Sequence, residues 1–536
     1  MTKKVIGKLV VITLMIITCG LSLNAQFSPQ SLKFGEVFDK ISNYYVDSVN
    51  QDKFIEEVIV QMLHDLDPHS SYLSKEEVNA MQEPLDGNFD GIGVSFNIMN
   101  DTIFIINTIS GGPSEMVGIR GGDRIIFIDG VNAAGIGIKN TDVQKKLKGK
   151  KGTKVKVSIK RKNEASLLDF TITRDQIPIY SIDASYMVDS KTGYIKLSRF
   201  SMTSVTEFYT AIAKLKSKGL ENLILDLSGN GGGYLRIAVE LADQFISGRN
   251  LLVYTEGVNN PRHNYYSTDR GEFQKGKLIV LIDESSASAS EIVAGAVQDL
   301  DRAVVIGRRS FGKGLVQQPF SLMDSSLIRL TVAKYYTPTG RLIQKSYEKG
   351  FDEYAKQVTE RFMFPEMNDS ATLSLPDSLK YHTVFKNRIV YGGGGITPDY
   401  FVPFDTSFFS TYYRELIGKG ILNQFILKYG DQNRPELLSK FKTFEEYKAS
   451  FVVSQKMKDE LIQYAEKEGV KFKEEDYKKS EPMIVMLCKA YLARDIWDTS
   501  EFFQIYNESD PIFKRAIEVL SESSLYEKKL EAYIVE

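Results

Sequence analysis

The segment 176–345 alternates short apolar runs with stretches of helical spacing, and this pattern constrains the fold more than any other. The apolar runs predict strands at 193–197, 222–227, 277–282, 303–306 and 327–336. Between them, apolar positions recur at helical intervals over 205–215, 234–245 and 288–297. Strands separated by amphipathic helices predict a sheet covered by helices. Together with the mixed stretch 346–405, this segment is expected to form an α/β core.

The segment 87–175 has a different pattern, in which glycines separate short strand-like runs. Asp129-Gly130 predicts a hairpin turn, and the alternation over 154–160 predicts a strand. A brief helix is expected at 143–147. This order of elements resembles a PDZ domain. The resemblance implies that an extended peptide adds to a sheet edge, while backbone amides of one turn hold its terminal carboxylate. That turn consists of Gly91, Ile92, Gly93 and Val94.

Both ends of the chain have the apolar spacing of helices. Near the N-terminus, Ser74 followed by Glu77 predicts a capping box at the start of a helix. We therefore expect an α+β multidomain chain, with a PDZ domain before an α/β core and helical segments on either side. The expected parts are a signal segment at 1–25, a helical segment at 27–86, a PDZ domain at 87–175, the core at 176–405 and a helical C-terminal extension at 406–536.

The first 25 residues have the pattern of a secretory signal peptide. Lys3, Lys4 and Lys8 precede an apolar run at 9–18, and a small residue, Ala25, ends a possible cleavage site. The run is shorter than the ~20 residues of a membrane span. The sequence thus predicts export across the inner membrane to the periplasm, with membrane association only if this segment is retained.

The composition argues against several classes of partner. Lysine and arginine total 67, against 69 for aspartate and glutamate, whereas nucleic-acid binding favours clustered excess positive charge. With four histidines and two cysteines, a zinc site of the usual Cys/His type and a disulfide framework are not expected. We therefore predict neither nucleic acid, metal nor cofactor as a partner.

Four serines follow the predicted strand 277–282, at the turn into the next helix. A serine at a helix N-terminus lies beside free backbone N–H groups that can stabilise an oxyanion. The same position also favours serine as a simple N-cap, so this segment alone leaves both interpretations open. The serines are Ser285, Ser286, Ser288 and Ser290.

A serine nucleophile needs a base, and none of the four histidines lies in a recognisable triad motif. Lys313 is an alternative, because burial lowers the pKa of a lysine until its neutral amine can accept a proton. It lies between Gly312 and Gly314, which allow close approach of the backbone. A solvated loop lysine is the competing interpretation.

The glycine turn at 226–233 follows a strand and opens a helix. Such a turn exposes backbone N–H groups that can hold an anion. A phosphate site is the alternative, but the Lys-Ser/Thr ending of a P-loop is missing here.

Over 35–405 these motifs together resemble the carboxyl-terminal processing peptidases, also called tail-specific proteases. The resemblance rests on 66–73, the PDZ segment, 226–233, 286–295, 312–317 and 336–341. It implies that Ser288 is the nucleophile and that Lys313, 25 residues later, is the general base. It further implies that Gln317 orients the lysine, that the amides of Gly232 and Ala289 form the oxyanion hole, and that Glu291 gives structural support.

The chain departs from the family pattern at two places. Gly231 stands where the family usually has proline, and Lys148 stands where an arginine is common. The resemblance implies that this arginine helps to couple the PDZ domain to the active site. Lysine lacks the planar fork of arginine, so that coupling is expected to be weak here.

The resemblance implies a secreted serine endopeptidase that acts on proteins with exposed C-terminal tails. A regulatory adaptor is a further partner that the PDZ segment allows. The alternatives are an inactive PDZ scaffold on a protease-like fold and an acyl-transfer enzyme for small substrates. Survival of the serine, lysine, glutamine and glycine turn favours the enzyme, and a peptide-binding domain argues against small substrates.

Overall fold

The structure is a computed structural model that describes residues 28–162, 164–363 and 376–531. The predicted signal segment lies outside these residues. The chain divides into two compact units, Met1–Leu66 and Asp67–Glu536. Within the described part of the chain, every helix is too short or too polar to cross a membrane.

Among its described residues the first unit has two helices, as the apolar spacing of this segment predicts. They are α2 (Pro29–Tyr44) and α3 (Gln51–His64). Each begins at a polar cap, because the side chains of Ser28 and Asn50 accept hydrogen bonds from free backbone N–H groups of the first turn.

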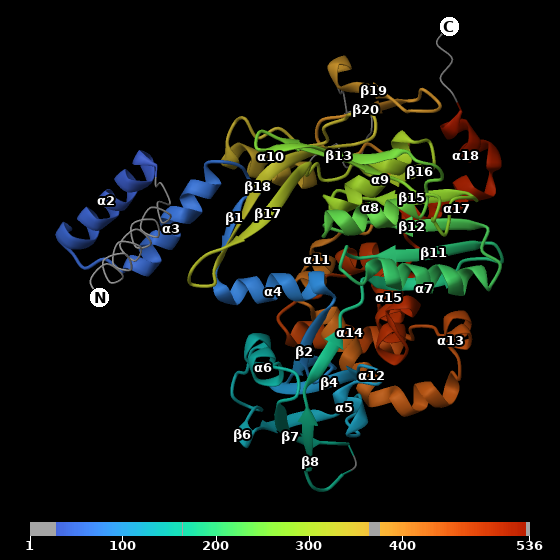
Figure 1. Cartoon of the computed structure of the whole chain (residues 1–536). Helices are drawn as coiled ribbons and strands as arrows, with labels where there is room; N and C mark the ends of the chain where they lie inside the picture. The colour runs from blue at the N-terminus through green and yellow to red at the C-terminus, as the bar shows by residue number, and fades with distance from the viewer. Residues whose placement is uncertain (1–27, 163, 364–375, 532–536) are drawn as a thin grey trace, which may run out of the picture. The chain divides into compact units, whose positions relative to one another are not determined.

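The second unit is organised around a six-stranded sheet (Figure 1). Its order is β10 (Ile182–Met187), β11 (Thr192–Leu197), β12 (Asn222–Asp226), β15 (Leu278–Ile282), β16 (Val304–Gly307) and β21 (Tyr400–Phe401). All neighbours are parallel except β10, which pairs antiparallel to β11. Parallel strands bring their carboxyl ends to one edge, and the loops after β12 and β15 leave from that edge.

Helices cover both faces of this sheet, as the alternating pattern predicts. One face packs against α7 (Ser204–Lys216), α8 (Leu235–Asp243) and α9 (Ala289–Asp299). The other face packs against α17 (Pro511–Ser521) and α18 (Ser523–Leu530). The end of the predicted helical extension is therefore a layer of the core rather than an appendage.

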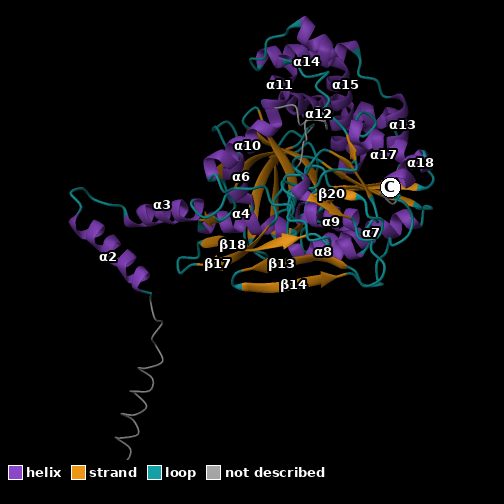
Figure 2. Cartoon of the chain, turned by 90° about the horizontal axis from the view of Figure 1, so that it is seen from above, coloured by secondary structure: helices purple, strands orange, loops and turns teal. Residues whose placement is uncertain are grey.

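The remaining C-terminal helices form a core of their own, visible as a group at the top of Figure 2. They are α11 (Thr411–Gly418), α12 (Ile421–Lys440), α13 (Phe444–Ser450), α14 (Gln455–Lys467), α15 (Glu474–Ile496) and α16 (Thr499–Tyr506). Cys488 lies inside this core, where burial raises the pKa of its thiol to about 12. A buried thiol of this kind packs as a small apolar side chain.

A second sheet has the order β1 (Ser71–Leu73), β18 (Leu327–Tyr336), β13 (Leu251–Gly257) and β14 (Asn260–Tyr266), with β17 (Leu315–Ser321) also paired to β18. The short strand β1 falls in a segment that we expected to be helical. Its place is set by pairing with β18, more than 250 residues away in sequence. The predicted capping box of Ser74 and Glu77 is confirmed at the start of α4 (Lys75–Asp86).

The PDZ domain has the sheet order β3 (Val94–Met99), β4 (Thr102–Thr108), β5 (Arg124–Ile128), β7 (Lys154–Lys160) and β8 (Leu168–Thr173), with β6 (Val131–Asn132) beside β5. Its helices are α5 (Pro113–Met116) and α6 (Asn140–Leu147). The hairpin prediction is confirmed, since Asp129 and Gly130 both have positive φ between β5 and β6. β3 is an edge strand and is thus open to pairing.

The PDZ sheet joins the rest of the chain through one antiparallel pair, β2 (Asn88–Gly91) and β9 (Asp175–Pro178). Along the chain, three further elements follow β18 and precede β21. They are α10 (Phe351–Met363) and the strands β19 (Lys380–His382) and β20 (Ile389–Tyr391), which form a small hairpin.

Candidate active site

Ser288 is the N-cap of α9, immediately after the loop that leaves β15. Its backbone has φ 56° and ψ −112°, a region that residues with a side chain rarely adopt. Its N–H donates to Glu291 Oε2 at 2.8 Å. Among the described residues its hydroxyl makes no hydrogen bond. Strain of this kind commonly marks functional positions, and here it leaves the hydroxyl unpaired.

The neighbouring serines are used in structural contacts. Ser286 Oγ donates to the carbonyl of Leu227 at 2.8 Å, and Ser290 Oγ donates to the carbonyl of Asn230 at 2.8 Å. Both serines are fully buried. Their hydroxyls tie the serine loop to the glycine turn, so the geometry favours Ser288 as the reactive serine of this loop.

Lys313 lies in the loop before β17, on the same side of the sheet edge as Ser288. Its Nζ donates to Gln317 Oε1 at 2.9 Å, the contact that the family resemblance implies. Gly312 packs on the backbone of Gly394, and Gly314 packs on Gln344 N, which explains the two flanking glycines. Gln317 in turn donates from Nε2 to the carbonyl of His69.

The electrostatic surroundings favour a neutral amine. Burial, and after it the positive charge of Arg329, lowers the pKa of Lys313 from 10.5 to about 8. Glu291 and Asp67 act in the opposite direction but more weakly. Burial, and then the charge of Lys313, lowers the pKa of His69 to about 4. His69 is therefore neutral over most of the pH range.

The glycine turn approaches the serine loop very closely. A Cβ on Gly232 would lie 2.8 Å from both Ala287 O and Ser288 Cβ, and 3.0 Å from Ala289 N. The Ala289 N–H has no partner among the described residues, as expected in the first turn of a helix. The Gly232 N–H donates to Asn230 Oδ1 at 2.9 Å. To act on an oxyanion, this amide must share or release that bond.

Two buried side chains brace the serine and lysine segments: Glu291, for which the family resemblance implies structural support, and Tyr335, which the sequence did not single out. Glu291 accepts from the N–H groups of Ser288, Gly312 and Lys313, and burial raises its pKa to about 7. Tyr335 Oη lies 3.0 Å from the carbonyl of Ser288 and 2.6 Å from that of Lys313. In the sequence, the Ser-x-x-Glu spacing indicates Glu291, whereas no local pattern indicates Tyr335.

Ser288, Lys313, Gln317 and Gly232 line one cavity of about 510 Å³. α4 forms a further part of its wall through Met81, Gln82, Pro84 and Leu85. Within the described residues, no hydrogen bond joins Ser288 Oγ to Lys313 Nζ. The structure therefore brings these four predicted site residues to one cavity.

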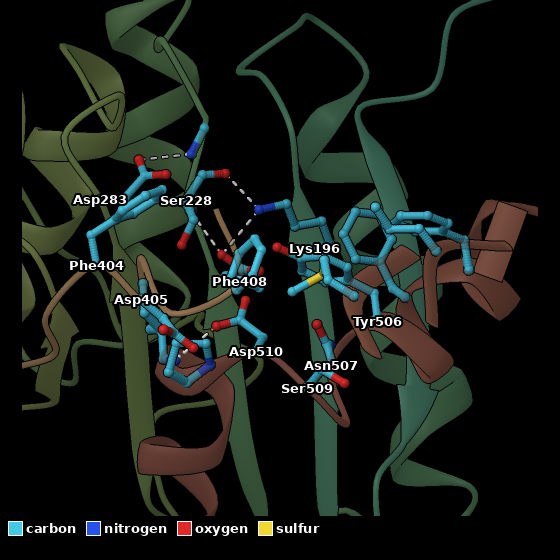
Figure 3. A pocket seen from close by; sticks show the side chains of 18 of the residues that line it. Lys196, Ser228, Asp283, Phe404, Asp405, Phe408, Tyr506, Asn507, Ser509 and Asp510 are labelled. Carbon is cyan, nitrogen blue, oxygen red and sulfur yellow. Dashed lines mark hydrogen bonds and ion pairs between the residues drawn. The ribbon is translucent and has the colours of Figure 1, made fainter. Parts of the chain in front are cut away.

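A second cavity, of about 470 Å³, lies behind the active-site loops against the C-terminal helices (Figure 3). In it, Lys196 Nζ donates to the carbonyl of Ser228 at 2.5 Å and lies 3.1 Å from Asp226. Asp283 accepts from the Gly229 N–H at 2.9 Å. The Asp283 contact joins the serine loop to the glycine turn, and the Lys196 contacts join the glycine turn to β11.

The turn predicted to bind a carboxylate lies between β2 and β3. The carbonyl of Ile92 accepts from the Ser114 N–H, and the carbonyl of Gly93 accepts from the Ile109 N–H. The N–H groups of Ile92 and Gly93 have no hydrogen-bond partner among the described residues. Gly91 and Val94 belong to the flanking strands β2 and β3.

Lys148, which replaces the arginine common in the family, still connects the PDZ domain to the active-site cavity. It is the C-cap of α6, and its Nζ donates to Glu83 on α4, the helix that lines the cavity. Its Nζ also lies 4.8 Å from the centre of the Phe89 ring.

The two neighbouring glycines Gly231 and Gly232 provide a matched test of the turn. A Cβ on Gly231 meets nothing within 4 Å, and its φ is not positive. We expect Gly231→Ala to keep most of the activity and to gain about 0.4–1 kcal/mol of stability. Gly232 has φ 102°, and its Cβ would collide with the serine loop. We expect Gly232→Ala to lower kcat at least ~10²-fold. Peptide cleavage rates and thermal unfolding of both variants check this, and equal effects would contradict it.

Comparisons with known protein families identify a peptidase and a PDZ domain in this chain. The family model described as peptidase family S41 matches residues 191–352, and that of the PDZ domain matches 91–172. A family of unknown function matches 412–498.

Individual relatives identify a narrower class of peptidase. The carboxy-terminal processing protease CtpB of Bacillus subtilis is 34% identical over 351 residues, which cover 65% of this chain and 71% of the relative. The carboxy-terminal-processing protease of Bartonella bacilliformis is 36% identical over 320 residues, 59% of this chain and 73% of the relative. The carboxyl-terminal-processing protease of Picosynechococcus is 33% identical over 296 residues, 54% and 70% respectively. The chain belongs to the carboxy-terminal processing proteases of peptidase family S41.

Proposed function

We propose that this protein is a serine endopeptidase that binds exposed C-terminal tails through its PDZ domain and hydrolyses peptide bonds with Ser288 and Lys313. The observation that carries the proposal is the cavity that these two side chains share. In it, an unpaired hydroxyl on a strained turn lies near a lysine whose pKa is lowered to about 8.

In the proposed mechanism the neutral amine of Lys313 accepts the proton of Ser288 Oγ as the oxygen attacks the substrate carbonyl. The oxyanion that forms accepts hydrogen bonds from the amides of Ala289 and Gly232, the latter redirected from Asn230. The Lys313 ammonium then gives its proton to the leaving amine, and the acyl-enzyme forms. Water hydrolyses this ester with Lys313 again acting as the base, which regenerates the serine.

Gln317 is proposed to orient the lysine. Its Oε1 accepts from Nζ while its Nε2 is held by the carbonyl of His69, so the amide cannot turn freely. This arrangement fixes the direction of one N–H bond of the amine. The lone pair of the nitrogen is then free to accept the proton of Ser288.

The test is proteolysis of an unfolded protein with a free C-terminal tail, combined with a fluorophosphonate that modifies activated serines. We expect new fragments and a single label, which peptide mapping places on Ser288. An intact substrate together with an unlabelled Ser288 would instead support the inactive PDZ scaffold.

Export to the periplasm is part of the same proposal and is supported by the signal-like residues 1–25. Fractionation of cells that express the full chain tests it: the protein is expected in the periplasmic fraction, and retention in the cytoplasm would contradict export.

The PDZ turn predicts a preference for free C-termini. A carboxylate held by the free N–H groups of Ile92 and Gly93 gains charge-assisted bonds of about 1.5–3 kcal/mol each. We therefore expect amidation of a peptide's C-terminus to raise its Kd about tenfold or more. Cleavage rates of matched free-acid and amidated peptides across a concentration series check this, and equal kinetics would contradict tail recognition.

The same series separates tethering from gating. If the PDZ domain only tethers substrate, excess amidated peptide restores the rate of the free acid. If the domain also gates, the maximal rate stays low. The contact between Lys148 and Glu83 connects the PDZ domain to α4, so Lys148→Met is expected to lower any gating component while leaving tail affinity unchanged.

A further inference from the structure

Besides Lys313, two positive side chains line the active-site cavity, Arg199 and Arg329, and the proposed chemistry uses neither. Arg329 is on β18, where its backbone lies between Ser71 of β1 and Pro319 of β17. Its side chain lines the same cavity as Ser288 and Lys313.

The guanidinium of Arg329 is poorly satisfied by the protein. Its Nε is buried without a hydrogen-bond partner, and Nη1 has one weak contact, to Met81 Sδ at 3.7 Å. Among the described residues no carboxylate lies within ion-pair distance of it. Burial lowers the pKa of this arginine below its usual value.

A half-buried and unpaired cation is costly for the free protein. The group has lost part of its hydration, and the nearby Lys313 repels it whenever the lysine is protonated. Most arginines in the core of this protein are instead paired, as Arg341 is with Asp299 and Arg388 with Asp301 and Asp399. An anion that enters the cavity would offset this cost, and the planar fork of arginine suits a carboxylate in particular.

We propose that Arg329 binds a carboxylate of the peptide substrate inside the active-site cavity. This rests on the proposed endopeptidase function, and it adds a preference for acidic substrates that is separate from tail recognition by the PDZ turn. The carboxylate is either an acidic side chain near the cleaved bond or the terminal carboxylate of a short tail.

The position of Arg329 also couples substrate charge to catalysis. Four groups face Lys313: Arg329 from β18, Glu291 from α9, and Asp67 and His69 from the loop before β1. Of these, Arg329 is the one whose charge lowers the pKa of the lysine. A carboxylate bound to Arg329 cancels that charge and raises the pKa of Lys313. Acidic peptides should therefore bind more tightly but reach their full kcat at higher pH.

The experiment compares peptides that differ only by Glu or Gln at successive positions around a cleaved bond, all with amidated C-termini. Binding is measured to the full chain carrying Ser288→Ala, and cleavage is measured with the unchanged enzyme. At one position we expect the Glu peptide to bind roughly 10- to 100-fold more tightly than the Gln peptide. The acid limb of kcat should lie at higher pH for that Glu peptide.

Variants assign the effect to the guanidinium. Arg329→Gln should remove the Glu preference and should move the acid limb of the Gln peptide to higher pH, since the positive charge near Lys313 is lost. Arg329→Lys keeps the charge and should keep part of the preference. Arg270→Gln, an exposed arginine outside the cavity, should change neither quantity.

A further pair, the Gln peptide with a free or an amidated terminus, identifies the source of the carboxylate. If Arg329→Gln weakens only the Glu peptide, the ligand is a side chain; if it weakens only the free acid, the ligand is the terminal carboxylate. The proposal is overturned if every peptide binds the Arg329→Gln variant as tightly as it binds the protein that retains the arginine. A Glu preference that depends on Arg329 in a protein that cleaves nothing would support this site while contradicting the endopeptidase function.

Discussion

Replacement of Ser288 by alanine is expected to lower kcat on the order of 10⁶-fold, because the hydroxyl is the proposed nucleophile. The same change should leave the free energy of unfolding almost unchanged, since Ser288 Oγ makes no hydrogen bond within the described residues. Tail binding by the PDZ domain should also persist. Single-turnover cleavage and urea unfolding of the purified variant measure the two effects.

Ser286→Ala and Ser290→Ala are the matched controls. Their hydroxyls donate to the carbonyls of Leu227 and Asn230 in the interior, so each change leaves a buried acceptor with one partner fewer. We expect each to cost about 1 kcal/mol of stability while much of the activity is retained. A variant Ser288→Ala that still cleaves, beside an inactive and folded Ser286→Ala, would overturn the assignment of the nucleophile.

Local patterns in the sequence place candidate serines at the start of a helix and a lysine between two glycines, and the family resemblance then selects Ser288 and Lys313 among the candidates. Ser288 follows a strand and begins a helix, and Lys313 lies between two glycines that the structure packs against backbone atoms of other segments. The strands and helices around them follow from apolar periodicity. Each of these signals lies within about ten residues, where side-chain spacing directly reflects the backbone geometry.

The parts that the sequence did not predict depend on pairing across long distances. β1 is a strand because it pairs with β18, and α17 is a layer of the core because its apolar face meets the sheet. Tyr335 lies in an ordinary strand pattern, and only the folded chain brings its hydroxyl to the carbonyls of Ser288 and Lys313. Contacts of this kind leave no mark in the periodicity of either partner.

Gly232 shows a different limit. The sequence indicates an exposed amide in a glycine turn, and the close approach to Ser288 agrees with that. It could not indicate that Asn230 from the same turn accepts the hydrogen bond of this amide. The partner of a backbone donor depends on a side-chain rotamer, and the composition of a turn does not specify it.

The cleavage rate is expected to rise with pH and to level off above pH ~8, because the neutral form of Lys313 is the proposed base. The sign follows from the direction of the shift: burial lowers the pKa of this lysine from 10.5 to about 8, so the neutral fraction is small at pH 6 and dominant at pH 9. Lys313→Ala lacks the base, and Lys313→Arg keeps a charge that cannot be removed in this pH range. Both variants are expected to be inactive at every pH. If Lys313 acted only through its positive charge, Lys313→Arg would stay active.

His69 supplies the control that separates a lysine base from a histidine base. With a pKa of about 4 its ring is already neutral where the enzyme works, and it reaches Gln317 through its backbone carbonyl rather than its ring. His69→Asn should therefore keep the acid limb near pH 8, with a lower rate only to the extent that the lost contact between the ring and Tyr354 loosens the site. A limb near pH 6.5 that disappears in His69→Asn would assign the base to this histidine, since an unperturbed imidazole titrates there. A limb that stays near pH 8 in His69→Asn, together with inactive Lys313→Arg, leaves the lysine as the group that titrates.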